Sequence, residues 1–215
     1  PTASRRDVVL AAPLGGWLIS LDEVADPVFA GRILGDGFAV DPTEGVLAAP
    51  FAGVVTSIHR ARHAVTLRAD EGPEVLMHIG LDTVALKGEG FEVKVAEGAR
   101  VALGDPLVTF DIDVLAQIVK SLVVPVVLTN PEEFTLSALV AGREVRAGEP
   151  VLLVRPVGGD GLPELATPVS GKDVVAEDAV VRRTATLADP YGLHARPAGV
   201  LAAIAKTSGD RVTLR

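Results

Sequence analysis

The sequence contains no cysteine and few aromatic residues, which make up 4% of its 215 positions. The absence of cysteine excludes a disulfide framework, a thiolate nucleophile and a zinc site with cysteine ligands. Because aromatics are scarce, the hydrophobic core must come from Val, Leu, Ile and Ala in a chain that is 48% hydrophobic. No apolar run approaches the roughly 18–20 residues that are needed to cross a bilayer, so no direct membrane insertion is expected.

The first residues, PTASRRDVVLAAP, lack both the apolar stretch of a signal peptide and an initiator methionine. We therefore expect a cytoplasmic protein, and we treat the sequence as a piece of a longer one. Its net charge of −8 argues against a nucleic-acid partner. Residues 181–215 differ, because their Lys and Arg outnumber their acidic residues, and this suggests a separate module.

Short runs of β-forming residues, broken by Gly, Pro and Asp, fill residues 8–156. This spacing predicts a mainly β domain, built as an antiparallel β-sandwich or barrel. A single brief helix is predicted over residues 113–119. The main predicted strands cover residues 54–58, 64–69, 75–81, 106–111, 123–129 and 150–155.

Two pairs of segments repeat within this stretch. APLGGW (12–17) recurs as APFAGV (49–54), and GARVALGDPLV (98–108) is echoed by GREVRAGEPVL (142–152). Similar turns are common in β proteins, but two different motifs recur here. We therefore predict that the β domain is internally duplicated.

Composition also suggests the domain boundaries. Residues 1–156 form the predicted β domain, and residues 157–180 begin with a Gly- and Pro-rich stretch and are interpreted as a linker. Residues 181–215 begin a second module. That segment is shorter than the roughly 40 residues that a domain usually needs to fold without disulfides or bound metal, so we expect the module to be incomplete.

His78 is the first candidate for chemistry, since it interrupts the apolar run of LMHIGLDTV (76–84). His63 precedes the neighbouring predicted strand, and a turn between the two strands could bring the histidines together. Paired imidazoles can ligate a metal, carry a phosphoryl group or be unrelated surface residues, and residue chemistry leaves these possibilities open. A zinc site would need a third ligand, for which His59 and Asp82 are the nearby candidates.

A second candidate lies in GLHARPAG (192–199). Pro197 favours the first turn of a helix, which would place His194 beside exposed N–H groups at the positive end of the helix dipole, where an anion is stabilised. Arg196 adds a guanidinium suited to phosphate oxygens. The alternative is that His194 is a simple N-cap and Arg196 a solvated side chain.

Both candidates lie in stretches that resemble components of one bacterial system. Residues 8–156 resemble the glucose-type enzyme IIA domain of the phosphoenolpyruvate:sugar phosphotransferase system, through AAPLGGWLIS, ARHAVTL, VLMHIGLDTVALKGEGF, GDPLVTFD and VVPVVLTN. YGLHARPAG resembles the amino-terminal part of HPr, the histidine phosphocarrier of that system. The resemblance implies an antiparallel β-sandwich followed by the beginning of an open-faced α/β module.

The resemblance also implies roles for single residues. His78 falls at the phosphorylated histidine of the enzyme IIA family, His63 at its supporting histidine and Asp82 at an acidic position beside the site. His194 falls at the phosphorylated histidine of HPr, and Arg196 at its phosphate partner. Phosphate would pass from phosphoenolpyruvate through enzyme I and His194 to His78, and then to a cysteine of an enzyme IIB domain that serves the IIC sugar permease. No cofactor and no metal is expected for such a transfer.

Three positions depart from the family pattern. The family usually has Thr two residues before its supporting histidine, where this chain has Ala61, and often Phe four residues before it, where this chain has His59. Residue 76, which is often aromatic in the family, is Leu76. The alternative function is that of a zinc metallopeptidase, with a duplicated β-sandwich and His63 and His78 as ligands. Four apolar residues are expected either to form a docking surface or to belong to the core: Phe38, Leu76, Met77 and Ile79.

Overall fold

The computed structural model describes residues 6–157 of the chain. The predicted linker beyond residue 157 and the predicted module over 181–215, with His194 and Arg196, lie outside the described residues. Within the described part, no helix is long and apolar enough to cross a membrane.

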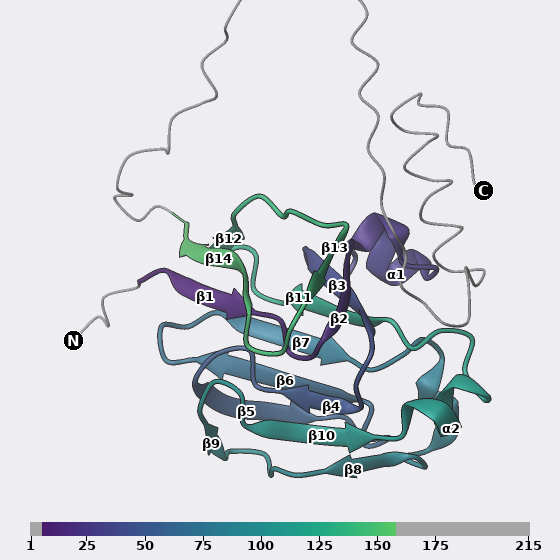
Figure 1. Ribbon diagram of the computed structural model, residues 1–215. Helices are drawn as coiled ribbons and strands as arrows, with labels where there is room; N and C mark the ends of the chain where they lie inside the picture. The colour runs from purple at the N-terminus through teal and green to yellow at the C-terminus, as the bar shows by residue number, and fades with distance from the viewer. Residues whose placement is uncertain (1–5, 158–215) are drawn as a thin grey trace, which may run out of the picture. The chain divides into compact units, whose positions relative to one another are not determined.

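Antiparallel sheets make up most of the described fold (Figure 1). The largest sheet has the order β13 (Arg143–Val145), β2 (Gly16–Ser20), β3 (Gly37–Pro42), β11 (Val124–Leu128), β7 (Glu74–His78), β6 (Ala64–Ala69), β5 (Gly53–Ile58), β9 (Arg100–Val101). One smaller sheet has the order β1 (Val8–Ala11), β14 (Pro150–Pro156), β12 (Phe134–Leu136), and the other β4 (Val46–Ala48), β10 (Pro106–Phe110), β8 (Phe91–Val93). The prediction of a mainly β, antiparallel fold is confirmed.

The predicted strands agree with the observed ones, except that the run over 75–81 leaves the sheet at His78. The backbone turns there because Gly80 and Asp82 have φ angles of 69° and 61°, in the left-handed region. The predicted helix over 113–119 is shorter, as α2 (Ile112–Ala116). The remaining helical segments are η1 (Leu21–Glu23), α1 (Pro27–Ala30) and η2 (Thr83–Leu86).

Hydrogen bonds relate the two copies of the repeated motifs. The amide of Ala11 donates to the carbonyl of Pro50 at 3.1 Å, and the amide of Ala48 donates to the carbonyl of Pro13 at 2.7 Å. The Gly-x-Pro turns match as well, since Gly104 N–H donates to Ala49 O and Gly148 N–H donates to Ala12 O, both at 2.9 Å. The internal duplication inferred from the sequence therefore corresponds to a repeated pattern of backbone contacts.

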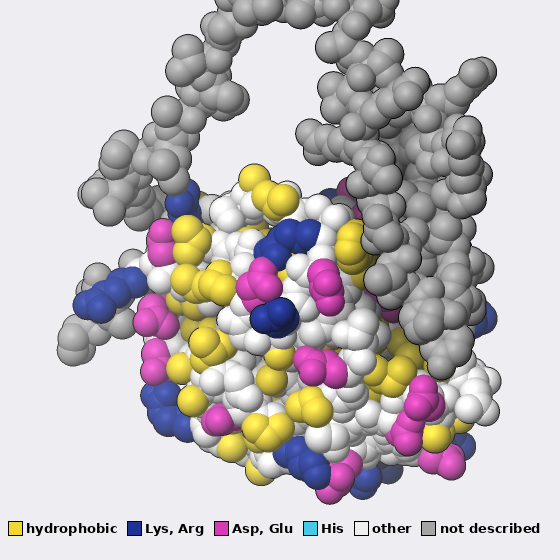
Figure 2. All heavy atoms as spheres, in the orientation of Figure 1, with side chains coloured by type: hydrophobic (Ala, Val, Ile, Leu, Met, Phe, Trp, Pro, Cys, Tyr) yellow, Lys and Arg dark blue, Asp and Glu magenta, His cyan; other side chains and the backbone are white. Residues whose placement is uncertain are grey.

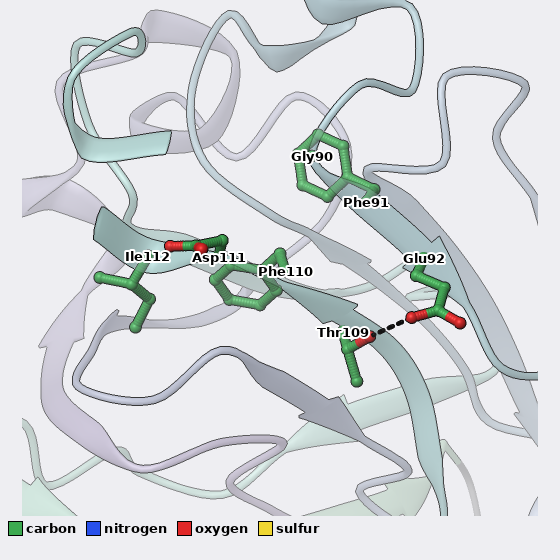
Figure 3. A pocket seen from close by; sticks show the side chains of 7 residues that line it. All are labelled: Gly90, Phe91, Glu92, Thr109, Phe110, Asp111 and Ile112. Atoms are coloured by element: carbon green, nitrogen blue, oxygen red, sulfur yellow. Dashed lines mark hydrogen bonds between the residues drawn. The ribbon is translucent and has the colours of Figure 1, made fainter. Parts of the chain in front are cut away.

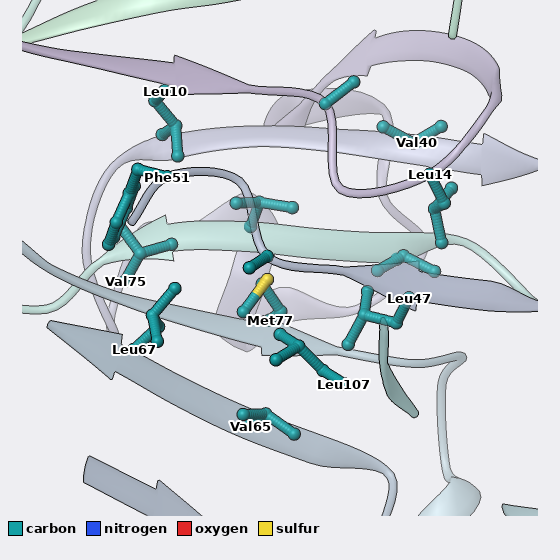
Figure 4. Packing of buried hydrophobic residues seen from close by; sticks show 14 of the residues in the cluster. Leu10, Leu14, Val40, Leu47, Phe51, Val65, Leu67, Val75, Met77 and Leu107 are labelled. Atoms are coloured by element: carbon teal, nitrogen blue, oxygen red, sulfur yellow. The ribbon is translucent and has the colours of Figure 1, made fainter. Parts of the chain in front are cut away.

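Side-chain alternation divides the buried residues between the two faces of the large sheet. Leu18 and Val40 belong to the main core, which Figure 4 shows in part, and this core also takes in residues of both smaller sheets. Ile19 and Ala39, one position along each strand, belong instead to an outer cluster that includes Phe29 of α1. The α1 segment is thus held against the outer face of the large sheet.

The surface has mixed charge. On the face shown in Figure 2, acidic and basic side chains alternate with scattered hydrophobic ones. Scattered apolar side chains are ordinary on folded proteins, so they do not by themselves indicate a binding surface.

Candidate functional site

His78 is the last residue of β7, where the strand gives way to a loop, and its side chain is partly exposed. Its ring nitrogen Nδ1 lies 2.8 Å from the carbonyl oxygen of Gly80. Because a carbonyl can only accept, Nδ1 carries the proton in this contact. In the neutral ring, the lone pair of Nε2 is therefore free to act as a nucleophile.

The loop that orients His78 is fixed by further hydrogen bonds. Gly80 N–H donates to Val123 O at 3.1 Å, and the buried Thr83 hydroxyl donates to Ile79 O at 2.8 Å. At Gly80, a Cβ atom would lie 2.7 Å from Cγ2 of Thr83 and 3.0 Å from Ser121 O. Glycine is required here both by the positive φ and by the lack of space.

His63 is placed beside His78 by the pairing of β6 with β7. Ala64, the first residue of β6, is opposite His78, and the Ile79 amide donates to the His63 carbonyl at 2.7 Å. The centroids of the two rings are 4.5 Å apart. The expected juxtaposition is confirmed, although His63 is buried, with 3% of its surface exposed.

Nδ1 of His63 is buried and has no hydrogen-bond partner among the described residues. This agrees with the sequence, in which the position of the usual threonine is occupied by Ala61. Burial is the main cause that lowers the pKa of His63, to about 4, and repulsion from His78 and His59 adds to it. The nearby backbone of Ala61 raises the pKa of His63 and so partly opposes this lowering, although it makes no hydrogen bond of normal geometry to Nδ1.

A third imidazole, that of the exposed His59, extends the pair. The His59 and His63 ring centroids are 4.5 Å apart, with 53° between the ring planes. From the sequence, His59 was predicted only as a possible third zinc ligand and as a substitute for phenylalanine. The spacing of four residues between His59 and His63 could have predicted this contact, because a tight turn of residues 59–62 brings the chain back into β6.

Asp82 lies on the loop after His78, and its carboxylate pairs with Lys120 at 3.1 Å. Asp26, which the sequence analysis missed, has an electrostatic effect on His78. Burial lowers the pKa of His78, while the hydrogen bond to Gly80 and the charge of Asp26 oppose that lowering. Asp26 caps α1 through a 2.8 Å hydrogen bond from Val28 N–H, so the Asp-Pro pair at 26–27 was a readable signal for a helix start.

The apolar surroundings of the site differ from one of the two expectations. Phe38, Met77 and Ile79 are fully buried, so they belong to the core. Leu76 is partly buried and packs against the outer cluster. The apolar side chains that are exposed on the neighbouring segments are Val28 of α1 and Val84 of η2, with 37% and 56% of their surface exposed. Phe29, which is buried, has its ring centroid 5.3 Å from that of His78.

Comparison with known proteins identifies the family in which this arrangement occurs. Residues 8–134 match the family described as phosphoenolpyruvate-dependent sugar phosphotransferase system, EIIA 1. The chain belongs to this family. It is similar to the PTS system glucose-specific EIIA component of Halalkalibacterium halodurans, with 42% identity over 157 residues, which cover 73% of this chain and 91% of that protein.

Other relatives agree with this assignment. The PTS system glucose-specific EIIA component of Bacillus cereus is 46% identical over 123 residues, which cover 57% of this chain and 74% of that protein. The solved structure of glucose permease IIA from Mycoplasma capricolum aligns with a TM-score of 0.65 and 40% identity, over 69% of this chain and 96% of that one. The protein is an EIIA component, a phosphotransferase that transfers phosphate through a histidine to a IIB domain. The metallopeptidase alternative gains no support from these relatives.

The EIIA domain also has an open hollow, lined by residues 90–92 and 109–112 (Figure 3). Phe91 connects the two regions, because its ring is 6.5 Å from His63 and 6.4 Å from Phe110. The acidic groups of the hollow are already engaged, since Glu92 pairs with Lys94 and Asp111 caps α2. Within the described residues, no group of three or more His, Asp or Glu side chains is arranged to hold a metal ion.

Replacing Gly80 with alanine is expected to lower both stability and phosphoryl transfer. Strain at φ 69° and the contacts with Thr83 and Ser121 should cost about 2–4 kcal/mol of unfolding free energy, measured by urea denaturation. Displacement of the Gly80 carbonyl from His78 should slow phosphorylation about tenfold. The matched control is Gly98→Ala, at φ 80° with no described atom within 4 Å of the added Cβ, which should leave the phosphorylation rate unchanged. Equal rates in both variants would contradict the role assigned to the loop.

The stability of the EIIA domain is expected to fall with pH because of His63. The unfolded chain binds a proton at this histidine below about pH 6.5, whereas the folded chain does so only near pH 4. The stabilisation is complete above the unfolded pKa and is lost as the pH falls through this window, by roughly 2–3 kcal/mol in total. Urea unfolding of His63→Gln should therefore depend less on pH between about pH 7 and pH 4.5 than that of the unmodified protein. Parallel pH dependence in the two proteins would show that His63 is not the group responsible.

Proposed function

We propose that Nε2 of His78 is the atom that carries the phosphoryl group. The observation that supports this most directly is the contact of Nδ1 with the Gly80 carbonyl, which directs the free lone pair of a partly exposed ring to Nε2. The lowered pKa of His78 keeps the ring neutral and nucleophilic at neutral pH. His63 is too deeply buried for a partner protein to reach it.

The transfer proceeds in two displacements. A P–N bond forms at His78 as the P–N bond to the donor histidine breaks, and it breaks in turn as a IIB cysteine thiolate forms a P–S bond. Attack through Nε2 leaves positive charge on the His78 ring, which Gly80 stabilises by accepting the Nδ1 proton in a hydrogen bond. His63 donates an N–H to the phosphoryl oxygens. An unpartnered buried N–H is more costly than an unpartnered ring nitrogen, so the proton of neutral His63 is favoured on Nε2 rather than Nδ1.

The donor in this proposal is an HPr-type phosphocarrier that receives phosphate from enzyme I. The HPr-like sequence at His194 and Arg196 supports a donor module carried on the same chain. Glucose is the proposed sugar, on the basis of the names of the relatives. We place Asp82 and its partner Lys120 at the rim of the site, where the charge of the pair would contact incoming proteins.

Incubation of the chain with phosphoenolpyruvate, enzyme I and HPr tests the proposal. We expect an acid-labile phosphoryl group on His78, located by mass spectrometry of peptides and separate from any phosphate on His194, and its transfer to a IIB domain. A His194→Ala variant, with and without added HPr, separates labelling by the chain's own segment from labelling by the external carrier. Stoichiometric phosphate on another residue of the EIIA domain, or no phosphate on His78, would overturn the assignment of His78.

A further inference from the structure

His63 must hold a defined orientation if it is to contact a phosphoryl group on its neighbour, as proposed above. Such rings are usually fixed by a hydrogen bond to the ring nitrogen that faces away from the reacting group. His63 lacks this restraint, because its Nδ1 has no partner among the described residues. Apart from the nearby backbone of Ala61, its orientation must therefore come from packing.

The rings around His63 are available to supply that packing. His78 and His59 each lie 4.5 Å away between centroids, and Phe91 lies 6.5 Å away. Phe91 belongs to the core and His78 is the proposed phosphoryl carrier, so neither is free to act as a dedicated support. His59 has no other role in the transfer described above.

His59 is itself held in place by its own turn. The Ala61 amide donates to Nδ1 of His59 at 3.1 Å, and the Arg62 amide donates to the His59 carbonyl at 2.7 Å. The proton of the neutral ring therefore lies on Nε2. His59 is thus anchored by the turn, whereas His63 is not anchored by any bond to its Nδ1.

We propose that His59 is a positioning residue of the phosphoryl-transfer site, whose ring, fixed by the 59–62 turn, holds the buried His63 ring in its working orientation. The inference rests on the proposed function. It is supported by the electrostatic effect of His59, which contributes to lowering the pKa of both His63 and His78. Ring packing thereby takes over the restraint that a hydrogen bond at Nδ1 would provide.

Three variants of the full chain test this role. His59→Ala removes the ring, His59→Phe keeps a ring without its nitrogens, and Arg60→Ala changes a neighbouring exposed side chain on the same turn. Transfer from phosphorylated HPr to His78 and from His78 to a IIB domain is measured in single turnovers. We expect transfer from His78 to the IIB domain to fall about tenfold in His59→Ala, to stay within about threefold of normal in His59→Phe and to be unchanged in Arg60→Ala, while acceptance from HPr changes little in all three.

A spectroscopic measurement separates positioning from a general loss of structure. Nitrogen-15 NMR of the labelled histidine rings reports the tautomer of His63, which we expect to be single in the unmodified chain and in His59→Phe. In His59→Ala, we expect the His63 signals to broaden or to show both tautomers, while the unfolding midpoint stays close to normal. If His59→Ala transfers phosphate at the normal rate with an unchanged His63 spectrum, the inference fails, but phosphorylation of His78 in the unmodified chain would still support the proposed function. If the unmodified chain itself is not phosphorylated at His78, the proposed function fails as well.

Discussion

Replacing His78 with alanine is expected to abolish phosphoryl acceptance from phosphorylated HPr, with a loss of at least about 10³-fold in rate. The reason is chemical, since alanine removes the nucleophilic nitrogen and the described site has no equivalent replacement. His63 is buried, and His59 uses Nδ1 to accept the Ala61 amide and lacks the carbonyl contact that activates His78. The measurement is labelled phosphate in the peptide that contains residue 78, which peptide mapping separates from any label at His194.

Folding must be shown separately in this variant. His78 is partly exposed at the end of β7, so its removal should cost only about 1 kcal/mol of unfolding free energy. If a His78→Ala chain unfolds near the normal urea midpoint and still accepts a phosphoryl group within the EIIA domain, the carrier is His59 or His63 and not His78. Peptide mapping would then identify which of them it is.

The strands and the histidine pair could be predicted from the sequence because their determinants are local. In β6, Val65 and Leu67 are buried while Thr66 and Arg68 are more exposed, so alternation alone indicates the strand. The short turn between β6 and β7 brings Ala64 opposite His78 and thus His63 beside it. Antiparallel pairing across a short turn has few alternatives, so His63 and His78 could be matched without a structure.

The outer side of the site could not be predicted in the same way. Asp26 and Phe29 reach His78 because α1 packs on the outer face of the large sheet, about fifty positions away in the sequence. Whether Phe38, Met77 and Ile79 are buried or exposed could likewise not be decided from the apolar runs that contain them, because both faces of the central strands are covered. The ion pair of the Asp82 carboxylate with Lys120 could not be predicted either, because it depends on a segment distant in the sequence.

The order of exposure across the three histidines bears on how the two transfer steps differ. His59 is exposed, His78 is partly exposed and His63 is buried, so a partner meets His78 while His63 stays behind it, out of the partner's reach. The donor step brings together a neutral histidine and a phosphohistidine. The acceptor step instead brings a cysteine thiolate toward a phosphoryl group that already carries negative charge, and it therefore depends more on hydrogen-bond donors at the phosphoryl oxygens.

For this reason, His63→Gln is expected to accept phosphate at His78 but to pass it to a IIB cysteine about 10²-fold more slowly. Glutamine retains an N–H donor, but its flexible side chain replaces a rigid ring that is packed 4.5 Å from both neighbouring rings. The measurement is a single-turnover chase, in which the chain is first phosphorylated by HPr, freed of donor and then mixed with a IIB domain. His59→Phe serves as the control, because it leaves the His63 imidazole in place. If His63→Gln loses acceptance and onward transfer equally, His63 acts on the nucleophile His78 itself, and not on the charge that develops when the thiolate attacks.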